Sequence, residues 1–294
     1  MLQVTPFHNE QTHSDLITVD LHCHSTYSDG ALSVHEVLNL AKLNGGQYLA
    51  LTDHDTVDGI VEAKQYAQAI SLHLIPGVEI SVTWSNNILI HIIGLNIDET
   101  NPELLNGLNQ LRGQRESRGR AIAEKLEKIG IKDAYAGAMQ YCNNPMALSR
   151  THFGRFLVDN GYAKAGKAFD KYLAQGKPGY VKQQWATLGD AVSWITHSGG
   201  IAVIAHPARY KLTRTKLLNL ITEFKECGGR GIEVVSSSHS KEDAISIGKI
   251  AKDTGLLASM GSDFHNTTPG YAKLSVGINH QLPIICGEAI YNHL

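Results

Sequence analysis

Two histidines near the start of this 294-residue chain, His22 and His24, are separated by one residue in a largely apolar run. Side chains of an extended strand alternate between its two faces, so both imidazoles point to one side and Cys23 points to the other. Neutral imidazole is among the commonest protein ligands of zinc, manganese and iron. The spacing therefore predicts part of a metal site.

Apolar runs farther along the chain also lead to residues that bind metals. They deliver His54, Glu79, His91, His206, Asp263 and His265, while Asp29 follows the first histidine pair in a turn sequence. His91 stands alone among aliphatic residues, where a hydrogen-bonded core histidine is the alternative interpretation. Chance does not readily place such residues after so many strand-like runs. We expect all of these side chains to meet in one cluster.

The segments between these runs are predicted to be helices. Ser33 and Glu36 form a capping-box sequence, and two glycines end that helix. Further helices are expected at 57–70, 187–197, 215–227 and 241–254, between strands at 19–24, 48–54, 74–81, 88–97, 201–207, 231–236 and 256–263. Aliphatic strands that alternate with helices predict an α/β fold with a parallel sheet. In a βα barrel the C-terminal strand ends meet at one mouth, which would gather the ligands.

The composition is that of an ordinary globular enzyme, with 43% hydrophobic residues. A formal net charge of −2 provides no global attraction to nucleic acid, so any such contact must be local. The four cysteines lack a Cys-x-x-Cys pair and are interpreted as reduced thiols. No signal-peptide pattern and no membrane-spanning run is found. We therefore expect a cytoplasmic protein with no membrane contact and no obligate protein partner.

Residues 101–184 interrupt the barrel pattern, which leaves 1–100 and 185–294 for the barrel itself. Apolar residues from Leu104 to Leu126 recur at helical spacing, and a second helix is expected at 151–159, capped by Ser149 or Thr151. The segment leaves the barrel at its expected catalytic face. We predict a helical insertion that acts as a lid.

Arginines are frequent in this insertion. We expect them on the faces of the first helix that the apolar stripe leaves free: Arg112, Arg115, Arg118 and Arg120. One interpretation is a solvated, charged helix face. The other is bidentate binding of phosphate, for which arginine is better suited than lysine.

The candidate ligands outnumber the four that one tetrahedral site uses. We expect two or three divalent ions, with a carboxylate such as Glu79 bridging a pair. Nitrogen and oxygen ligands without cysteine favour Mn²⁺, with Zn²⁺ and Fe²⁺ as alternatives, over Mg²⁺ and Ca²⁺. Closely spaced metals stabilise both the attacking and the leaving oxygen of an in-line phosphoryl displacement. The predicted reaction is hydrolysis of a phosphoester.

These blocks resemble those of the polymerase and histidinol phosphatase (PHP) superfamily, whose members share a distorted seven-stranded βα barrel with a multinuclear metal site. The likeness covers nearly the whole chain, including the insertion and the run 199–210. It is greatest to a bacterial branch of nucleoside 3′,5′-bisphosphate phosphatases and 5′→3′ exoribonucleases. The resemblance implies a first metal held by His22, His24, Glu79 and Asp263, a second by Glu79, His91 and His206, and a third by Asp29, His54 and His265.

Some members of the family carry histidine at the position of Asp29, where this chain offers a carboxylate to the third metal. Asp20, Asp53 and Asp55 are interpreted as partners that orient imidazoles. As alternatives, Asp20 is a strand-end cap and Asp55 a helix N-cap.

The resemblance further implies that a 3′ phosphate binds across the metals and that the ribose 3′ oxygen leaves. One mechanism would then serve nucleoside 3′,5′-bisphosphates and short 5′-phosphorylated RNA, releasing nucleoside 5′-monophosphates. A second pocket for the 5′ phosphate is expected. Candidate substrate-binding residues are Arg115, Arg118, Arg150 and His152, with Arg209 and His239 as further candidates. The tryptophans Trp84, Trp185 and Trp194 are assigned to the core, with stacking against a base as the alternative interpretation.

Three alternative functions stay open at this point. One is a histidinol-phosphate phosphatase, against which the long arginine-bearing insertion argues. Another is a non-catalytic, nucleic-acid-binding PHP module, which absence of turnover with bound manganese would support. The third is a structural metalloprotein.

Overall fold

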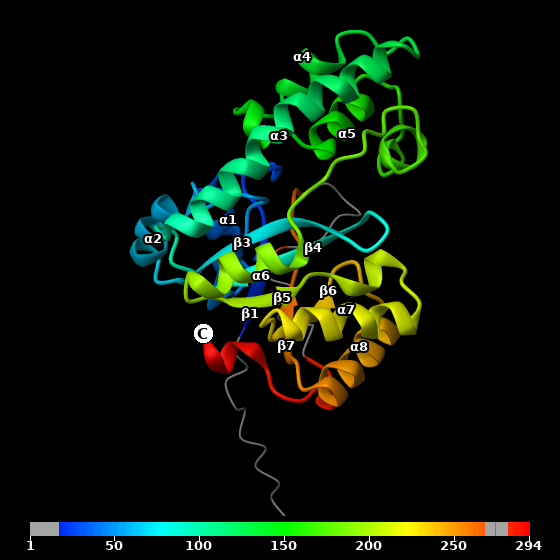
Figure 1. The fold of residues 1–294 in the computed structure, drawn as a ribbon. Coiled ribbons are helices and arrows are strands. Elements are labelled where there is room, and N and C mark those ends of the chain that lie inside the picture. The colour runs from blue at the N-terminus through cyan, green and yellow to red at the C-terminus, as the bar shows by residue number, and fades with distance from the viewer. Residues whose placement is uncertain (1–17, 268–273, 275–281) are drawn as a thin grey trace, which may run out of the picture.

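A seven-stranded sheet curls into a nearly closed barrel in the computed structural model, which describes residues 18–267, 274 and 282–294 (Figure 1). Neighbouring strands follow chain order: β1 (Val19–Cys23), β2 (Tyr48–Leu51), β3 (His73–Trp84), β4 (Ile88–Leu95), β5 (Ile201–Ile204), β6 (Gly231–Ser236) and β7 (Leu257–Gly261). The first and last strands meet just beyond β7, where the N–H of Asp263 donates to the carbonyl of His22 at 2.8 Å. The predicted α/β barrel is confirmed.

The sheet is not parallel throughout, and the expectation of seven parallel strands is wrong for β4. This strand runs antiparallel to both β3 and β5, while the other pairings are parallel. Only a short turn joins β3 to β4, with Asn86 and Asn87 both at positive φ. A parallel crossover needs a dozen or more residues, so a connection of this length can only make a hairpin.

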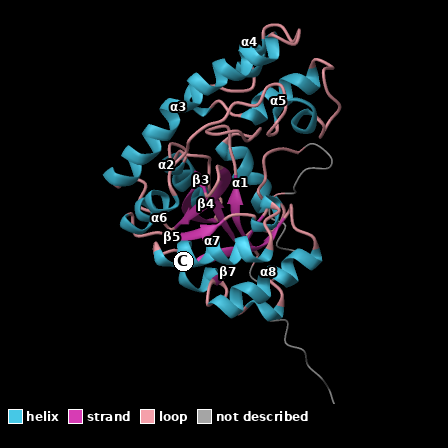
Figure 2. Cartoon of the chain, turned by 45° about the vertical axis from the view of Figure 1, so that its right-hand side comes forward, coloured by secondary structure: helices cyan, strands magenta, loops and turns pink. Residues whose placement is uncertain are grey.

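Helices pack around the outside of these strands (Figure 2). They are α1 (Val34–Leu43), α2 (Ile60–Ala69), α6 (Leu188–His197), α7 (Arg214–Glu226) and α8 (Lys241–Thr254), with short 3₁₀ turns at η1 (Pro145–Ala147), η3 (Pro207–Tyr210), η5 (Ile284–Cys286) and η6 (Ile290–His293). The capping box predicted from Ser33 and Glu36 begins α1. Expected and observed helix bounds agree closely, except that α2 begins three residues later than expected.

The insertion contains α3 (Pro102–Glu127), α4 (Ala134–Met139), α5 (Arg150–Asp159) and the π-helical turn η2 (Phe169–Leu173). Figure 1 shows α3 rising from the barrel toward α4 and α5. The first half of α3 belongs to the barrel core through Leu104 and Leu108, and its second half belongs to a separate apolar cluster through Ile122 and Leu126. The long helix α3 therefore connects two packed regions.

Two arginines of α3 do not lie where the sequence predicted. Arg115 and Arg118 are 4% and 7% exposed and lie on the buried face of the helix, between Leu111 and Ile122. Arg120 is exposed, which agrees with the interpretation of a solvated, charged helix face. No helix in the described part of the chain has both the length and the apolar character to span a membrane.

Candidate metal centre

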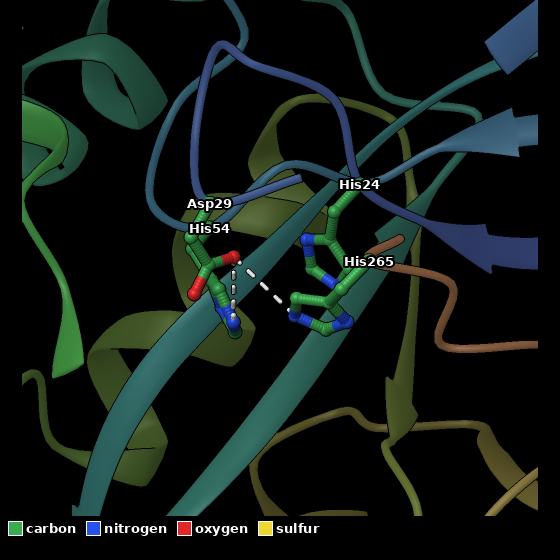
Figure 3. A group of neighbouring side chains, drawn as sticks. All are labelled: His24, Asp29, His54 and His265. Atoms are coloured by element: carbon green, nitrogen blue, oxygen red, sulfur yellow. Dashed lines mark ion pairs between the residues drawn. The ribbon is translucent and has the colours of Figure 1, made fainter. Parts of the chain in front are cut away.

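Histidines and carboxylates from all parts of the barrel meet at its mouth. They form three groups, in each of which the candidate ligand atoms lie within 4.8 Å of one another: His22, His24, Glu79 and Asp263; His54, Glu79 and His91; and His24, Asp29, His54 and His265. Figure 3 shows the third group, with the imidazoles of His54 and His265 turned toward the carboxylate of Asp29. Eight of the predicted ligands thus share one cluster, and His206 joins it through Glu79.

The histidine pair of β1 has the geometry that strand alternation predicts. The Nε2 atoms of His22 and His24 lie 3.2 Å apart, and each is 3.4 Å from Oδ1 of Asp263. Cys23 points elsewhere, with its Sγ against the carbonyl of Ala50. Ligand atoms from the two ends of the barrel sheet therefore converge on one point.

Glu79 lies at the centre of the cluster, in the middle of β3 and not at its end. Its Oε1 atom is 2.9 Å from His91 Nδ1 and 3.0 Å from His206 Nε2. Its Oε2 atom is 2.9 Å from His54 Nδ1 and 3.3 Å from His24 Nε2. One carboxylate that faces imidazoles on both sides has the arrangement expected of a ligand bridging two metals.

His91 reaches this point because β4 is reversed. It stands in the first half of β4, directly opposite Ser81 of β3, so its side chain shares the face of the sheet that carries Glu79. In a parallel strand, a residue this early would lie away from the mouth. The hairpin thus supplies ligands from both of its strands.

Several carboxylate oxygens in the cluster have no hydrogen-bond partner within the described part of the chain. Oδ1 of Asp29, Oε2 of Glu79 and Oδ1 of Asp263 are all buried in this state: imidazole nitrogens lie nearby, but their geometry forms no hydrogen bond. Buried charged oxygens without donors are costly, and native structures avoid them. Divalent cations would satisfy all three, so the residues present fit a metal centre.

The charges of the cluster support the same conclusion. Burial alone would raise the pKa of Glu79, but the surrounding imidazoles hold it well below its usual range. Burial would lower the pKa of His24, yet contacts with Asp263 and Glu79 raise it to about 10. The carboxylates thus favour a proton on His24, whereas burial lowers the pKa of His206 to about 4 and keeps that imidazole neutral; a divalent cation would take the place of the proton.

A buried carboxylate that was not predicted from the sequence forms hydrogen bonds with two of the histidines. Glu233 of β6 is fully buried, with Oε1 2.9 Å from Nδ1 of His22 and Oε2 accepting the N–H of His206 at 2.6 Å. A hydrogen bond at Nδ1 leaves Nε2 of His22 free to face the cluster. The signal in the sequence was a lone glutamate inside an aliphatic strand.

The backbone is strained where these ligands stand. His206 and Asp263 have φ values of 27° and 52°, in the left-handed region that non-glycine residues rarely adopt. Such strain persists only where the surroundings fix it, and it gathers at functional sites. Gly261 is required beside them, because a Cβ there would lie 2.3 Å from Cβ of His22.

The three aspartates assigned to imidazole orientation have other contacts. Oδ1 of Asp20 accepts the N–H of Ser262 at 2.8 Å, as a strand-end cap would. Asp53 binds the hydroxyls of Ser25 and Ser28 and so holds the loop that carries Asp29. Asp55 is not a helix N-cap, because α2 begins at residue 60; it accepts hydrogen bonds from Ser81 and Arg115.

A pocket lies between the cluster and the insertion. Its described lining includes Asp29, His54, Ser81, Leu89, His91, Arg115, Arg118, Ser149, Arg150, Thr151, Phe169, Trp185, Arg209 and His265. Candidate ligands thus form one wall, and residues of the insertion form another. The pocket is a polar chamber with a metal-binding side and a cationic side.

The arginines in this pocket differ in how they are paired. Arg115 forms an ion pair with Asp55, and Arg209 one of 2.6 Å with Asp263. Arg118 has no carboxylate within ion-pair distance among the described residues, and its Nε has no hydrogen-bond partner there. Burial, Arg150 and Arg115 lower the pKa of Arg118 to about 9. This buried guanidinium is an uncompensated cation that an anion would stabilise.

Other predicted substrate residues lie at different places. Arg150 lines the pocket beside Phe169, whereas His152 is not among the lining residues, because its Nδ1 accepts the N–H of Ser149 to cap α5. Burial lowers the pKa of His152 to about 4. His239 is also outside the lining, with Nδ1 against the carbonyl of Val234.

Two further residues contribute to this region: Arg155 was not foreseen, and Trp185 was predicted to be a core residue with base stacking as the alternative. Arg155 of α5 donates to the carbonyl of Asp29 at 2.6 Å and so connects the lid to a ligand loop. Trp185 is buried, as expected of a core tryptophan, but it also lines the pocket, with the guanidinium groups of Arg115 and Arg118 5.0 and 5.3 Å from its ring. Both roles depend on tertiary contacts that no local pattern shows.

Known proteins resemble this chain in sequence and in structure. A 3′,5′-nucleoside bisphosphate phosphatase of Chromobacterium violaceum is 47% identical over 92% of this chain and 94% of its own length. A 5′-3′ exoribonuclease of Haemophilus influenzae is 44% identical over 84% of this chain and 89% of its own. A solved structure described as an amidohydrolase from Chromobacterium violaceum, with bound sulfate and no metal, has a TM-score of 0.90 at 45% identity, covering 94% of this chain and 95% of that one.

The family model described as PHP domain matches residues 20–181, which include the ligands from His22 to His91 and most of the insertion. His206, Asp263 and His265 complete the same cluster from outside that match. The resemblance drawn from the sequence is confirmed, and the chain belongs to the PHP domain family.

Proposed function

We propose that this protein is a metal-dependent phosphoesterase that hydrolyses the 3′-phosphoester of 5′-phosphorylated nucleotides. It would act as a nucleoside 3′,5′-bisphosphate phosphatase and as a 5′→3′ exoribonuclease on short RNA and on ribosomal RNA 5′ ends, releasing nucleoside 5′-monophosphates. The names of the relatives from Chromobacterium violaceum and Haemophilus influenzae support the two activities. The observation that carries the proposal is the buried, unpaired Arg118 in the pocket that the metal-binding cluster also lines.

The metal ligands are proposed as the sequence assigned them: His22, His24, Asp29, His54, Glu79, His91, His206, Asp263 and His265. Two or three divalent ions, with Mn²⁺ as the first choice and Zn²⁺ or Fe²⁺ as alternatives, would activate water and neutralise the phosphoryl oxygens. Glu233 holds His22 with Nε2 toward the cluster. The carboxylates of Glu79 and Asp263 stay ionised, since their pKa values lie well below the usual range.

Residues 101–184 are proposed as a lid that binds the other end of the substrate. Arg118 and Arg150 would hold the terminal 5′ phosphate, with the hydroxyls of Ser149 and Thr151 in the same lining. Arg115 is held by its ion pair with Asp55. Two fixed anion sites would place the first 3′-phosphoester at the metals and restrict cleavage to the 5′ end.

Arg209 is placed to act between the two sites. Its side chain is about half exposed, and its guanidinium donates to Oδ2 of Asp263 at 2.6 Å, so it lines the pocket from the metal side. We propose that it contacts the 3′ phosphate. His239 and His152 have no place in this scheme, since neither is among the residues that line the pocket.

The test is to incubate the manganese-loaded protein with adenosine 3′,5′-bisphosphate, with 5′-phosphorylated and 5′-hydroxyl oligoribonucleotides, and with histidinol phosphate. We expect phosphate from the bisphosphate and 5′-monophosphates from the 5′-phosphorylated oligonucleotide alone. Preferential hydrolysis of histidinol phosphate would refute the proposal. So would equal cleavage of 5′-phosphorylated and 5′-hydroxyl RNA, because the cationic pocket would then have no role.

A further inference from the structure

Phe169 is an exposed aromatic side chain in the wall of the substrate pocket. It is 38% exposed, although large apolar side chains of the lid such as Phe153 and Leu157 are fully buried. It begins the π-helical turn η2, on the segment that returns from the lid to the barrel. Turns of this kind are rare and occur frequently at functional sites. Phe169 thus keeps part of its side chain open beside the pocket that it lines.

The other aromatic groups of the pocket are already occupied. Trp185 is only 7% exposed and lies against two guanidinium groups. The imidazoles of His54, His91 and His265 belong to the metal-binding cluster. Among the described residues that line the pocket, Phe169 is therefore the more exposed of the two aromatic rings outside the metal-binding cluster.

The neighbours of Phe169 connect it to the proposed phosphate site. The guanidinium carbon of Arg150 lies 5.6 Å from the centre of its ring, and Arg150 lines the same pocket. Gly154 of α5 stands beside it, where a Cβ would come within 3.4 Å of the ring. A nucleotide whose 5′ phosphate binds Arg150 would thus have its remaining parts near the ring.

The lining also indicates how a base would be recognised. Base edges are read mainly by arginine, asparagine and glutamine; the described lining has neither asparagine nor glutamine, and its arginines are paired with carboxylates or proposed to bind phosphate. Stacking on an aromatic face requires no particular base, because every base has a π face. An enzyme that removes nucleotides one after another from RNA needs such tolerance.

We propose that Phe169 is the platform on which the base of the 5′-terminal nucleotide stacks. The inference rests on the proposed function and adds to it a binding residue for the nucleoside part of the substrate. It explains how a site with phosphate contacts at both ends can accept any of the four bases. It also distinguishes nucleotides from small phosphate esters that carry no ring.

The experiment compares two substrates and three variants in the manganese-loaded full chain. The substrates are adenosine 3′,5′-bisphosphate and its abasic tetrahydrofuran analogue with both phosphates in place. F169A and F169L remove the aromatic face, and F169L keeps most of the apolar volume as a safeguard for folding. F169Y restores the face, and I129A, at an exposed apolar residue of the lid outside the pocket lining, is the control.

We expect F169A and F169L to raise KM for the adenosine substrate by about 5- to 100-fold, the range for loss of a base–aromatic stack, with kcat little changed. KM for the abasic analogue should stay within about twofold in every variant. F169Y and I129A should behave as the wild type with both substrates.

Equal changes for both substrates, or no change for either, would overturn the stacking role and leave the proposed function intact. A wild-type protein that hydrolyses neither substrate would overturn the proposed function, and this inference with it. A defect in F169Y equal to that of F169A would also contradict stacking, since tyrosine provides the same face.

Discussion

The carboxylate of Glu233 offers a direct test of how the metal centre is held. Oε1 lies 2.9 Å from Nδ1 of His22, and Oε2 accepts the N–H of His206 at 2.6 Å. In E233Q, one of these two oxygens becomes an NH₂ donor, so one of the two hydrogen bonds is broken whichever way the amide turns. Either His22 is then without its support at Nδ1, or the N–H of His206 is without its acceptor at a strained backbone position.

The size of the effect follows from the role of such partners. Removal of a group that orients a metal-binding histidine typically weakens metal affinity by about 10- to 100-fold. We expect the same loss for Mn²⁺ in E233Q, which corresponds to about 1.4–2.7 kcal/mol. The substitution keeps the size of the side chain, so no cavity contributes to the change.

The assay is a titration with Mn²⁺ against a competing chelator, with the wild type and E233Q compared at one pH. E226Q is the matched control, because Glu226 is exposed at the end of α7. Circular dichroism would establish that the metal-free variants are folded. Wild-type manganese affinity in folded E233Q would refute the reasoning, and equal weakening in E226Q would assign the effect to net charge.

Four further predictions concern the metal-binding cluster and the insertion. H22A and D263A should abolish turnover in folded protein, and wild-type rates in D263A would contradict the metal assignment. R118A should raise KM for 5′-phosphorylated substrates at least tenfold, the effect of about 1.4 kcal/mol or more. R115A should instead lower the free energy of unfolding by about 3–5 kcal/mol in urea titrations, because the buried carboxylate of Asp55 loses its cationic partner. The pKa of His152 in the folded protein is lowered to about 4. As pH falls below 6.5, the unfolded chain therefore binds a proton at this residue before the folded chain does. This difference should lower the free energy of unfolding by roughly 3 kcal/mol between pH 6.5 and 4. H152Q, in which glutamine keeps the capping box, should lose correspondingly less free energy of unfolding over this pH range in urea titrations. Equal losses in H152Q and the wild type would contradict this prediction.

The metal-binding cluster was predictable because its signals are local. Alternation within β1 places His22 and His24 on one face, and a barrel brings the ends of distant strands together. The reversal of β4 was also within reach of the sequence. Ser85–Asn87 is too short for a parallel crossover, and the aliphatic composition of the strands obscured this.

The burial of the lid arginines was not predictable in the same way. Arg115 and Arg118 follow the spacing of the apolar stripe, but only tertiary contacts with Asp55 and Trp185 make that face tolerable for charge. Phe169 gave no periodic signal at all. Positions such as these depend on which surfaces meet in the folded protein, and no local pattern in the sequence shows that.

The near-zero net charge of the chain conceals a division that matters for the proposed reaction. Residues 101–184 hold 14 of the 26 lysines and arginines but only 7 of the 28 aspartates and glutamates. The insertion is therefore strongly positive and the barrel strongly negative, although the sum is −2. Divalent cations bound in the barrel would offset the negative charge of the barrel. The insertion would attract an anionic substrate even when no metal is bound. Because the insertion retains this charge when metals are removed, a 5′-phosphorylated oligonucleotide should still bind the metal-free protein, more weakly as salt rises, and R118A should bind it less well.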